Sequence, residues 1–367
     1  MKIGILTYHR AENYGALLQA YALRTYLQSL GHDVSFVDYW PEYHKDYFRI
    51  LPRKRMIYGR LKSKAASLYY GLVWCLPRMK RKRVLESFMR NFLSLSDCPQ
   101  YTTGKDYCSE FEVVIYGSDQ IWRRQELPGH KGVDYWYYGS DNIKARKIAY
   151  AASMGANKPS KEELSELLPL LTNFELLTVR ETSLKNYLKS FNIDAKLVVD
   201  PVFLLRSDQW RELSERSSAA FTPQKYILFY NLLNNPASSK FAETLGEKTG
   251  LPIIEITKRY GFHYLGSRYL HSVSVPQFVR LIDKASYVVS NSFHGVAMSI
   301  ILGKQFYAVG MGKKADRVKS LLEVFGIQDR CFEASDQADI PPIDYEAVGI
   351  QMESYIASSK QILQNSI

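Results

Sequence analysis

The fold class of this chain is decided by residues 2–38, KIGILTYHRAENYGALLQAYALRTYLQSLGHDVSFVD. The apolar run at 2–7 predicts a strand, and apolar residues at helical spacing after Leu17 predict a helix that ends at Gly31. Residues 34–38 then predict a second strand. A strand, a loop, a helix and a second strand in this order form the repeating unit of a parallel, doubly wound α/β sheet.

The same alternation continues along the 367 residues, a length that exceeds what one hydrophobic core usually organises. The polar stretch at 206–222 is typical of a crossing between domains. We therefore predict two Rossmann-like lobes with a cleft between them, at 1–200 and 201–340, and a final helix within 341–367 that packs back on the N-terminal lobe. The further strands are expected at 112–116, 147–152, 174–179, 195–199, 226–230, 252–256, 286–290 and 305–309. The further helices are expected at 161–171, 181–190, 236–249, 276–284, from about 293, 315–325 and 345–363.

The basic residues are concentrated in one segment, residues 45–90. The chain has 48 Lys and Arg against 37 Asp and Glu, a net charge of +11, and this segment holds 14 of the basic and 2 of the acidic residues. It also contains aromatic and aliphatic residues and interrupts the rhythm of strands and helices, which indicates an insertion in the N-terminal lobe. Two interpretations remain open, an amphipathic element on an anionic membrane surface and a solvated helical pair whose apolar side is core. Nucleic-acid binding is not expected, because no RNA-binding aromatic motif, zinc finger or helix-turn-helix accompanies the charge.

The composition gives no indication of a metal site, a disulfide framework or a membrane span. The four cysteines have neither C-x-x-C spacing nor a partnered histidine pattern: Cys75, Cys98, Cys108 and Cys331. The N-terminal apolar run is too short for a signal peptide or a membrane span. No dense carboxylate cluster of the kind that holds Mg²⁺ or Mn²⁺ is evident either. We therefore expect a cytoplasmic protein that uses no metal and no other cofactor.

Small and polar residues follow four of the expected strands. In a doubly wound sheet, ligands bind at the carboxyl ends of the strands, where helix N-termini present unpaired N–H groups. The junctions between strand and helix are therefore the expected binding site. They lie at 13–15, 117–120, 153–155 and 291–295.

The fourth junction contains His294. It follows an apolar strand directly and opens a helix of small and apolar residues. The neighbouring Asn291, Ser292 and Gly295 offer amide, hydroxyl and backbone N–H groups that suit an anion. An imidazole can donate or accept a proton near neutral pH, so a role in catalysis is one interpretation. A histidine that only caps the helix start is the other.

Two arginines lie at further junctions, one in each predicted lobe. Arg180 follows an apolar strand, and Arg317 lies at the start of a helix. Guanidinium groups match carboxylates and phosphates bidentately, although each arginine is equally suited to a surface salt bridge. Asp119 is a candidate base or a helix cap, and Trp122 is a candidate ligand-binding residue or part of the core.

Seven motifs follow one another from residue 1 to about residue 330. They are the glycine loop and helix at 4–7 and 13–23, G-S-D-Q-x-W at 117–122, Y-A-A-S-x-G at 150–155, V-R-E at 179–181, D-P-V at 200–202, N-S-F-H-G at 291–295 and R-V-K-S-L-L at 317–322. Each motif alone is generic. Together, and in this order, they resemble the polysaccharide pyruvyl transferase family.

The resemblance implies a two-lobed fold like that of GT-B glycosyltransferases, with phosphoenolpyruvate as the donor. It also implies a pair of saccharide hydroxyls as the acceptor, with a cyclic pyruvate ketal and phosphate as the products. It places His294 at the family's essential histidine and Arg180 at an arginine that engages the donor. Many members have Arg-Leu-His-Gly where this chain has Ser-Phe-His-Gly, so a guanidinium is missing at Ser292. We expect Arg317 to replace it.

The resulting hypothesis makes His294 the general acid and Asp119 the general base. The acceptor is expected to be a surface polysaccharide precursor linked to a polyprenyl diphosphate, with residues 45–90 at the anionic inner face of the membrane. A nucleotide-sugar glycosyltransferase and a non-catalytic membrane-surface assembly factor remain alternatives. The residues expected to bind the donor are Arg180, Arg317, Ser153, Gly155, Asn291, Ser292 and Gly295, and those expected to bind the acceptor are Asn13, Tyr14, Gly15 and Trp122.

Overall fold

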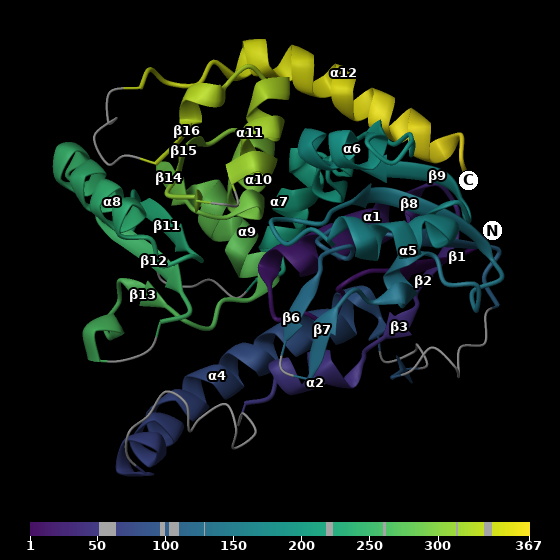
Figure 1. Ribbon diagram of the computed structural model, residues 1–367. Coiled ribbons are helices and arrows are strands. Elements are labelled where there is room, and N and C mark those ends of the chain that lie inside the picture. Colours follow the sequence, from purple (N-terminus) through teal and green to yellow (C-terminus); the bar gives the residue numbers. More distant parts are fainter. Residues whose placement is uncertain are drawn as a thin grey trace.

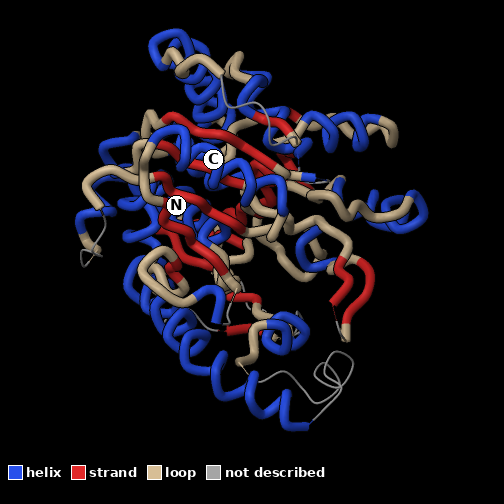
Figure 2. Tube along the Cα trace, turned by 90° about the vertical axis from the view of Figure 1, so that its left-hand side faces the viewer, coloured by secondary structure: helices blue, strands red, loops and turns tan. Residues whose placement is uncertain are grey.

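The computed structural model contains two lobes, each built on a six-stranded parallel sheet (Figure 1). This arrangement confirms the predicted pair of Rossmann-like lobes. Helices flank the strands of the sheets in the view turned by 90° (Figure 2). The structure describes residues 1–50, 64–95, 100–102, 110–127, 129–217, 223–259, 262–312, 315–333 and 340–367. Cys98 and Cys108 lie outside these residues.

The N-terminal lobe has the strand order β10-β9-β8-β5-β1-β2. Its central strands are almost fully buried, as expected for a sheet covered by helices on both faces. The strands are β1 (Lys2–Leu6), β2 (Asp33–Phe36), β5 (Val113–Tyr116), β8 (Arg146–Ala152), β9 (Phe174–Val179) and β10 (Lys196–Leu197). The helices are α1 (Tyr14–Ser29), α5 (Lys161–Leu171) and α6 (Thr182–Lys189). All of these elements fall where the sequence predicts them, within a few residues.

The C-terminal lobe has the strand order β13-β12-β11-β14-β15-β16. Its edge strands β13 (Tyr269–Leu270) and β16 (Cys331–Phe332) are too short for the sequence pattern to reveal. The other strands are β11 (Ile227–Asn231), β12 (Ile253–Thr257), β14 (Tyr287–Ser290) and β15 (Gln305–Val309). The helices are α8 (Pro236–Thr249), α9 (Val275–Lys284), α10 (Phe293–Ile301), α11 (Ala315–Val324) and α12 (Tyr345–Gln364).

The polar stretch that begins at residue 206 is more than an irregular connection between the domains. Its first part forms helix α7 (Ser207–Glu215), which buries Trp210 and Leu213 against the C-terminal lobe. The prediction missed this helix because its apolar residues are few. Shorter elements complete the chain: η4 (Pro201–Leu204), η5 (Phe262–Tyr264), η7 (Gln328–Arg330), η3 (Tyr135–Tyr138), the pair β3 (Asp38–Tyr39) and β4 (Gln100–Tyr101), and the hairpin β6 (Gln125–Leu127) and β7 (His130–Gly132).

The two lobes share one continuous hydrophobic core. Tyr14, at the start of α1, stacks on Phe278 of α9 with ring centroids 4.6 Å apart, and its hydroxyl donates a hydrogen bond to the Val273 carbonyl at 2.8 Å. The final helix α12 crosses both lobes (Figure 1). At its start the Tyr345 hydroxyl bonds the Lys304 carbonyl at 2.6 Å, and near its end Ser359 Oγ accepts a hydrogen bond from the Val199 N–H at 3.1 Å. The helix therefore ties the C-terminal lobe to the N-terminal one.

The basic segment predicted as an insertion contains the last part of α2 (Glu42–Tyr47) and most of α4 (Lys64–Leu93). Helix α4 extends away from the lobes at its first end (Figure 1). Its last turns pack into the shared core through Leu85, Phe88 and Met89. Residues 51–63 of the segment lie outside the described part of the chain. None of the helices that the structure describes is long and apolar enough to cross a membrane.

Candidate active site

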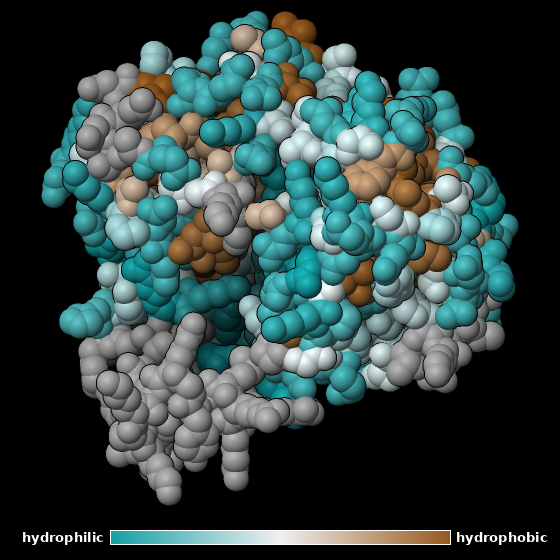
Figure 3. Space-filling model, viewed as in Figure 1, coloured by the Kyte–Doolittle hydropathy of each residue, from teal (hydrophilic) through white to brown (hydrophobic). Residues whose placement is uncertain are grey.

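A cleft of about 440 Å³ opens between the carboxyl ends of the two sheets. The space-filling view shows that this face of the molecule is hollowed between the lobes and is largely hydrophilic there (Figure 3). The N-terminal lobe lines the cleft with Tyr8, Ala11, Glu12, Asn13, Trp40, His44, Tyr47, Phe48, Asp119, Gln120, Arg123, Gln125 and Leu127. The C-terminal lobe lines it with Leu232, Lys258, Asn291, Ser292, Phe293, His294, Met311 and Arg317.

His294 lies in the first turn of α10 and faces this cleft, as the sequence predicts. Its side chain is 8% exposed, and its Nε2 lies 3.6 Å from Asp200 Oδ2. Its Nδ1 lies beside Gly15 of the opposite lobe: a Cβ at residue 15 would approach Nδ1 to 2.0 Å. A side chain at residue 15 would therefore displace the imidazole. Asn13 holds this loop by accepting a hydrogen bond from the Gly15 N–H at 3.0 Å.

Replacing Gly15 with alanine is expected to displace the His294 ring. Turnover should then fall about 100-fold or more, which is the rate contribution of one general acid. Gly15 lies within a helix, where alanine is intrinsically favourable, so the protein should stay folded. The matched control is Gly349→Ala in α12, where an added Cβ meets no atom within 4 Å. Steady-state kinetics and thermal unfolding of both variants test this. Equal activity of the two variants would contradict a close contact between residue 15 and the His294 ring.

Asp200 lies behind His294 and was not predicted as a site residue. It caps η4 through the Val202 N–H at 3.1 Å, accepts a hydrogen bond from Ser118 Oγ at 2.9 Å and is paired with Arg180. Burial alone would raise the pKa of this carboxyl, but the charges of Arg180 and His294 more than offset it, so the pKa of Asp200 lies well below its usual value. A fixed negative charge therefore stands beside the imidazole. The D-P-V motif was the only sequence signal for it.

Arg180 is buried one layer behind the cleft wall. Its side chain is 1% exposed, and its guanidinium lies over the Phe293 ring at 4.9 Å. Burial lowers the pKa of Arg180, but Asp200, Glu181 and Asp119 raise it above its usual value. The sequence predicted that Arg180 binds the donor; in this arrangement it contacts Asp200 and Ser118 instead, and reaching a ligand in the cleft would require rearrangement.

Arg317 supplies a guanidinium to the cleft itself. Its guanidinium also lies over the Phe293 ring, at 5.7 Å. The Gln120 side-chain oxygen accepts a hydrogen bond from its Nη2 at 2.9 Å once the amide is oriented toward it. Burial and the neighbouring charge of Arg180 lower the pKa of Arg317 to about 10, so it stays protonated at neutral pH. The same wall of the cleft contains Ser292, His294 and Arg317. The prediction that Arg317 replaces the guanidinium missing at Ser292 requires this placement.

Two of the predicted acceptor-binding residues do not face the cleft. Trp122 is fully buried, its indole N–H donates to the Tyr137 carbonyl at 2.6 Å, and its ring stacks on Tyr138. Tyr14 is fully buried between the lobes against Phe278. Both predictions are therefore corrected, because each ring fills core and has its polar atom satisfied there. Asn13 and Gly15 do lie at the cleft or against His294.

Of the other predicted donor-binding residues, Asn291 lines the cleft, and Ser153, Gly155 and Gly295 lie behind its wall. Ser153 Oγ donates to Glu181 Oε1 at 2.7 Å and accepts from the Gly155 N–H at 3.2 Å. Gly155 has a φ of +61° and packs against Gln120, where a Cβ would come within 2.6 Å. Asn291 and Gly295 lie in the C-terminal lobe. The side-chain Oδ1 of Asn291 accepts hydrogen bonds from the Leu232 and Leu233 N–H groups, and Gly295 packs closely on Ser290.

An aromatic wall on the N-terminal lobe was not predicted as part of the site. It comes from the end of β1 and from α2 and its flanks, and Trp40 stacks on Phe48 with centroids 5.7 Å apart. Burial, helped by the charge of Arg123, lowers the pKa of His44 to about 3, so this imidazole is neutral. The sequence signal was the dense run of aromatic residues at 39–48, which starts before the basic segment. The wall consists of Tyr8, Trp40, His44, Tyr47 and Phe48.

One comparison with known proteins, the family model, agrees with the motifs. No curated protein matches the chain. Among solved structures, the chain is similar to the glycosyltransferase SnogD from Streptomyces nogalater, with 11% identity over 100% of both chains and a TM-score of 0.44. It is also similar to UDP-GlcNAc 2-epimerase from Neisseria meningitidis bound to UDP-GlcNAc, with 10% identity over 100% of this chain and 99% of that chain and a TM-score of 0.49. The model of the family described as polysaccharide pyruvyl transferase matches residues 13–312. The chain, with its His294 cleft between two Rossmann-like lobes, therefore belongs to the polysaccharide pyruvyl transferase family of transferases.

Proposed function

We propose that this protein transfers the pyruvyl group of phosphoenolpyruvate to two hydroxyls of a sugar in a surface polysaccharide precursor. The products are a cyclic pyruvate ketal and phosphate. The observation that carries the proposal is His294, which is held in the cleft between Gly15 and the buried carboxylate of Asp200. A positioned imidazole beside a cationic wall suits proton transfer to an anionic donor.

The donor carries a carboxylate and a phosphate, and the C-terminal wall of the cleft offers groups for both. Arg317 provides a fork that matches either anion, and the Ser292 hydroxyl is not engaged in capping α10. The N-terminal end of α10 adds a partial positive charge at the same place. In this arrangement Arg180 is a positioning residue: it holds Asp200, and Asp200 faces His294.

His294 acts as the general acid. Because Nε2 faces Asp200, the proton leaves from Nδ1, the nitrogen beside Gly15, and moves to C3 of the donor, which becomes a methyl group. The first sugar hydroxyl attacks C2 and gives its proton to Asp119. The bond between C2 and the phosphate oxygen then breaks, and phosphate departs with the proton from Asp119. The second hydroxyl attacks C2, closes the ring and returns a proton to His294.

The aromatic wall supports a sugar as the acceptor. The faces of Trp40, Tyr47 and Phe48 offer flat apolar surface, while Gln125 and Arg123 add polar groups beside it. A precursor linked to a polyprenyl diphosphate at the inner membrane face would also bring anionic groups near the basic segment at 45–90. The described part of this segment begins beside the same wall, at α2.

The test is transfer of isotope from labelled phosphoenolpyruvate to a panel of free and lipid-linked galactose, glucose and mannosamine acceptors. We expect one pyruvate ketal and one phosphate per turnover with at least one acceptor. Nucleotide sugars serve as the rival donors. Sugar transfer from a nucleotide sugar, with no transfer of label from phosphoenolpyruvate, would establish a glycosyltransferase instead. If neither donor reacts and phosphoenolpyruvate causes no thermal shift, the protein is a non-catalytic assembly factor.

A further inference from the structure

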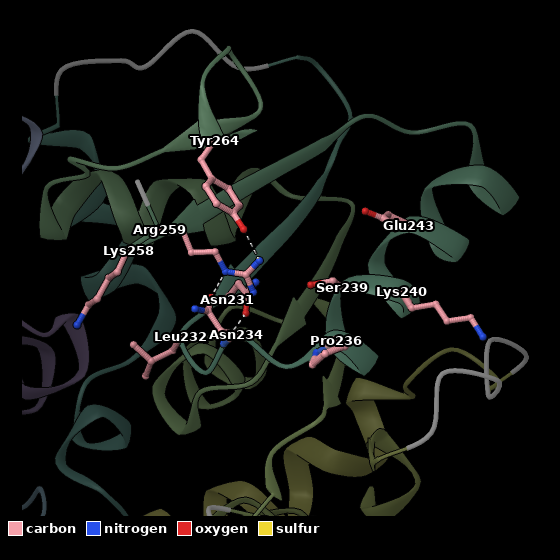
Figure 4. Close-up of a pocket in the computed structure, with 10 residues that line it drawn as sticks. All are labelled: Asn231, Leu232, Asn234, Pro236, Ser239, Lys240, Glu243, Lys258, Arg259 and Tyr264. Atoms are coloured by element: carbon pink, nitrogen blue, oxygen red, sulfur yellow. Dashed lines mark hydrogen bonds between the residues drawn. The ribbon is translucent and has the colours of Figure 1, made fainter. Parts of the chain in front are cut away.

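A second cavity, which we name the C-lobe pocket, lies wholly in the C-terminal lobe. Its volume is about 910 Å³, and it opens at the carboxyl ends of β11 and β12. The close-up shows its side chains arranged around the first turn of α8 and the loop that follows β12 (Figure 4). The lining residues are Asn231, Leu232, Asn234, Pro236, Ser239, Lys240, Glu243, Lys258, Arg259 and Tyr264.

The charge of the C-lobe pocket is positive. Three of its side chains are cationic, Lys240, Lys258 and Arg259, against the single carboxylate of Glu243. That carboxylate lies 3.5 Å from Arg268, a further cation outside the lining. The residues that line the pocket therefore present a net positive charge to any ligand.

The Arg259 guanidinium is held in a fixed position. Its Nε donates to the Asn234 side-chain oxygen, and its Nη1 donates to the Tyr264 hydroxyl at 3.0 Å (Figure 4). The guanidinium also lies over the Tyr264 ring at 5.4 Å. None of the described residues accepts a hydrogen bond from its Nη2. A guanidinium that is already oriented loses less conformational entropy when it binds an anion.

The helix start contributes little to this charge. Pro236 has no N–H group, and the Asn235 side chain already accepts the Ala237 N–H at 2.8 Å. The side chains of Lys240, Lys258 and Arg259 therefore determine what the pocket binds.

The C-lobe pocket adjoins the cleft. Leu232 and Lys258 line both cavities. Lys258 also acts across the cleft on Glu12 of the other lobe. Burial raises the pKa of Glu12, and the charge of Lys258 is one of those that oppose this rise. A ligand that extends from the cleft past Lys258 enters the C-lobe pocket.

We propose that the C-lobe pocket binds the phosphoryl groups of a phosphorylated acceptor whose sugar lies in the cleft at His294. The proposal rests on the function proposed above. Phosphoenolpyruvate is a small molecule, and together the cleft and the pocket offer far more room than it fills. A fixed guanidinium and two ammonium groups suit phosphate oxygens. Tyr264 is the only aromatic residue in the described lining, so the pocket offers no pair of rings to enclose a nucleobase.

Binding of inorganic pyrophosphate tests the site without catalysis. Isothermal titration is expected to show binding that weakens with salt. The double variant Lys240→Gln/Arg259→Gln should raise the Kd about 10-fold or more, since it loses charge-assisted hydrogen bonds. The matched control Lys189→Gln/Arg216→Gln removes the same charges from exposed positions on α6 and beside α7, and should leave the Kd unchanged. An equal Kd for both double variants, or no binding to the unaltered protein, would overturn the proposal.

Kinetics distinguish the two sources of a phosphoryl group. The unaltered protein should prefer an acceptor saccharide that carries a diphosphate over the same saccharide without it, by kcat/KM, and the Lys240→Gln/Arg259→Gln variant should lose that preference. If the pocket holds only the released phosphate, the variant will instead weaken product inhibition by inorganic phosphate and keep the preference, which overturns the proposal. Failure of the proposed function gives a different result: no acceptor receives the pyruvyl group from phosphoenolpyruvate, whether or not the protein binds pyrophosphate.

Discussion

Replacing His294 with asparagine is expected to lower phosphate release from phosphoenolpyruvate and acceptor by about 10²–10⁴-fold, the usual contribution of one general acid. Asparagine keeps a polar group of similar reach but cannot deliver a proton to C3. The effect should fall on kcat, because Arg317 and Ser292 remain to bind the donor. Single-turnover measurements with labelled donor at saturating acceptor give the chemical step directly.

The control for this variant is His32→Asn. His32 lies in the turn before β2, at the sheet edge opposite the cleft, and undergoes the same chemical change. Both variants should unfold cooperatively at temperatures near that of the unaltered protein. Turnover by His294→Asn within a few fold of the control would remove His294 from the mechanism.

Replacing Asp200 with asparagine is expected to cost about 3 kcal/mol of folding stability, since it leaves the buried guanidinium of Arg180 without its closest carboxylate. The double variant Asp200→Asn/Arg180→Gln should recover part of that loss, because it removes both charges. Chemical denaturation of the two single variants, Asp200→Asn and Arg180→Gln, and of the double variant at pH 7 measures the coupling. A double variant less stable than the sum of its single changes would contradict an ion pair between these residues.

Asp200→Asn should also lower kcat with little change in the KM for phosphoenolpyruvate, because Asp200 faces His294 and does not line the cleft. Asp283→Asn is the matched control: Asp283 is another mostly buried carboxylate, 2.9 Å from Arg211 Nε, and lies on α9 outside the cleft. It should lose stability without losing kcat. Equal kcat for the two variants would reduce Asp200 to a structural role.

Stability should depend on pH through the same carboxyl. Folding lowers the pKa of Asp200 below its usual value, so its contribution to stability is complete above that usual value and is lost as the pH falls through the lowered one. The gap in unfolding free energy between the unaltered protein and Asp200→Asn should therefore narrow between about pH 4 and pH 2. Urea unfolding at several pH values measures it.

The sequence predicted the architecture well because strand and helix periodicity are local. The buried runs at 113–116 and 287–290 are short apolar segments that the pattern identifies directly. It missed α7, whose buried face consists of few residues such as Trp210 and Leu213, and the two-residue edge strands. Such elements depend on contacts with distant parts of the chain, which periodicity does not record.

The site was predicted in part for the same reason. Asp119 follows a strand of the N-terminal sheet, and His294 and Arg317 follow strands of the C-terminal sheet. The carboxyl ends of both sheets face one cleft, so topology brings these residues together. Whether an aromatic ring at these ends fills the core or faces the cleft depends on tertiary packing, which is why Trp122 was assigned to the acceptor and Trp40 was not. The motifs could indicate which positions matter, but not which layer each occupies.

The ring stack between Tyr14 and Phe278 has a consequence for how substrates are chosen. Opening the lobes by rotation would break that stack and expose part of the shared core to water, so such a rotation costs free energy. Gly15 and His294 then stay opposed before any substrate arrives. If the proposed function holds, we expect acceptors to be selected by size when they bind to this cleft.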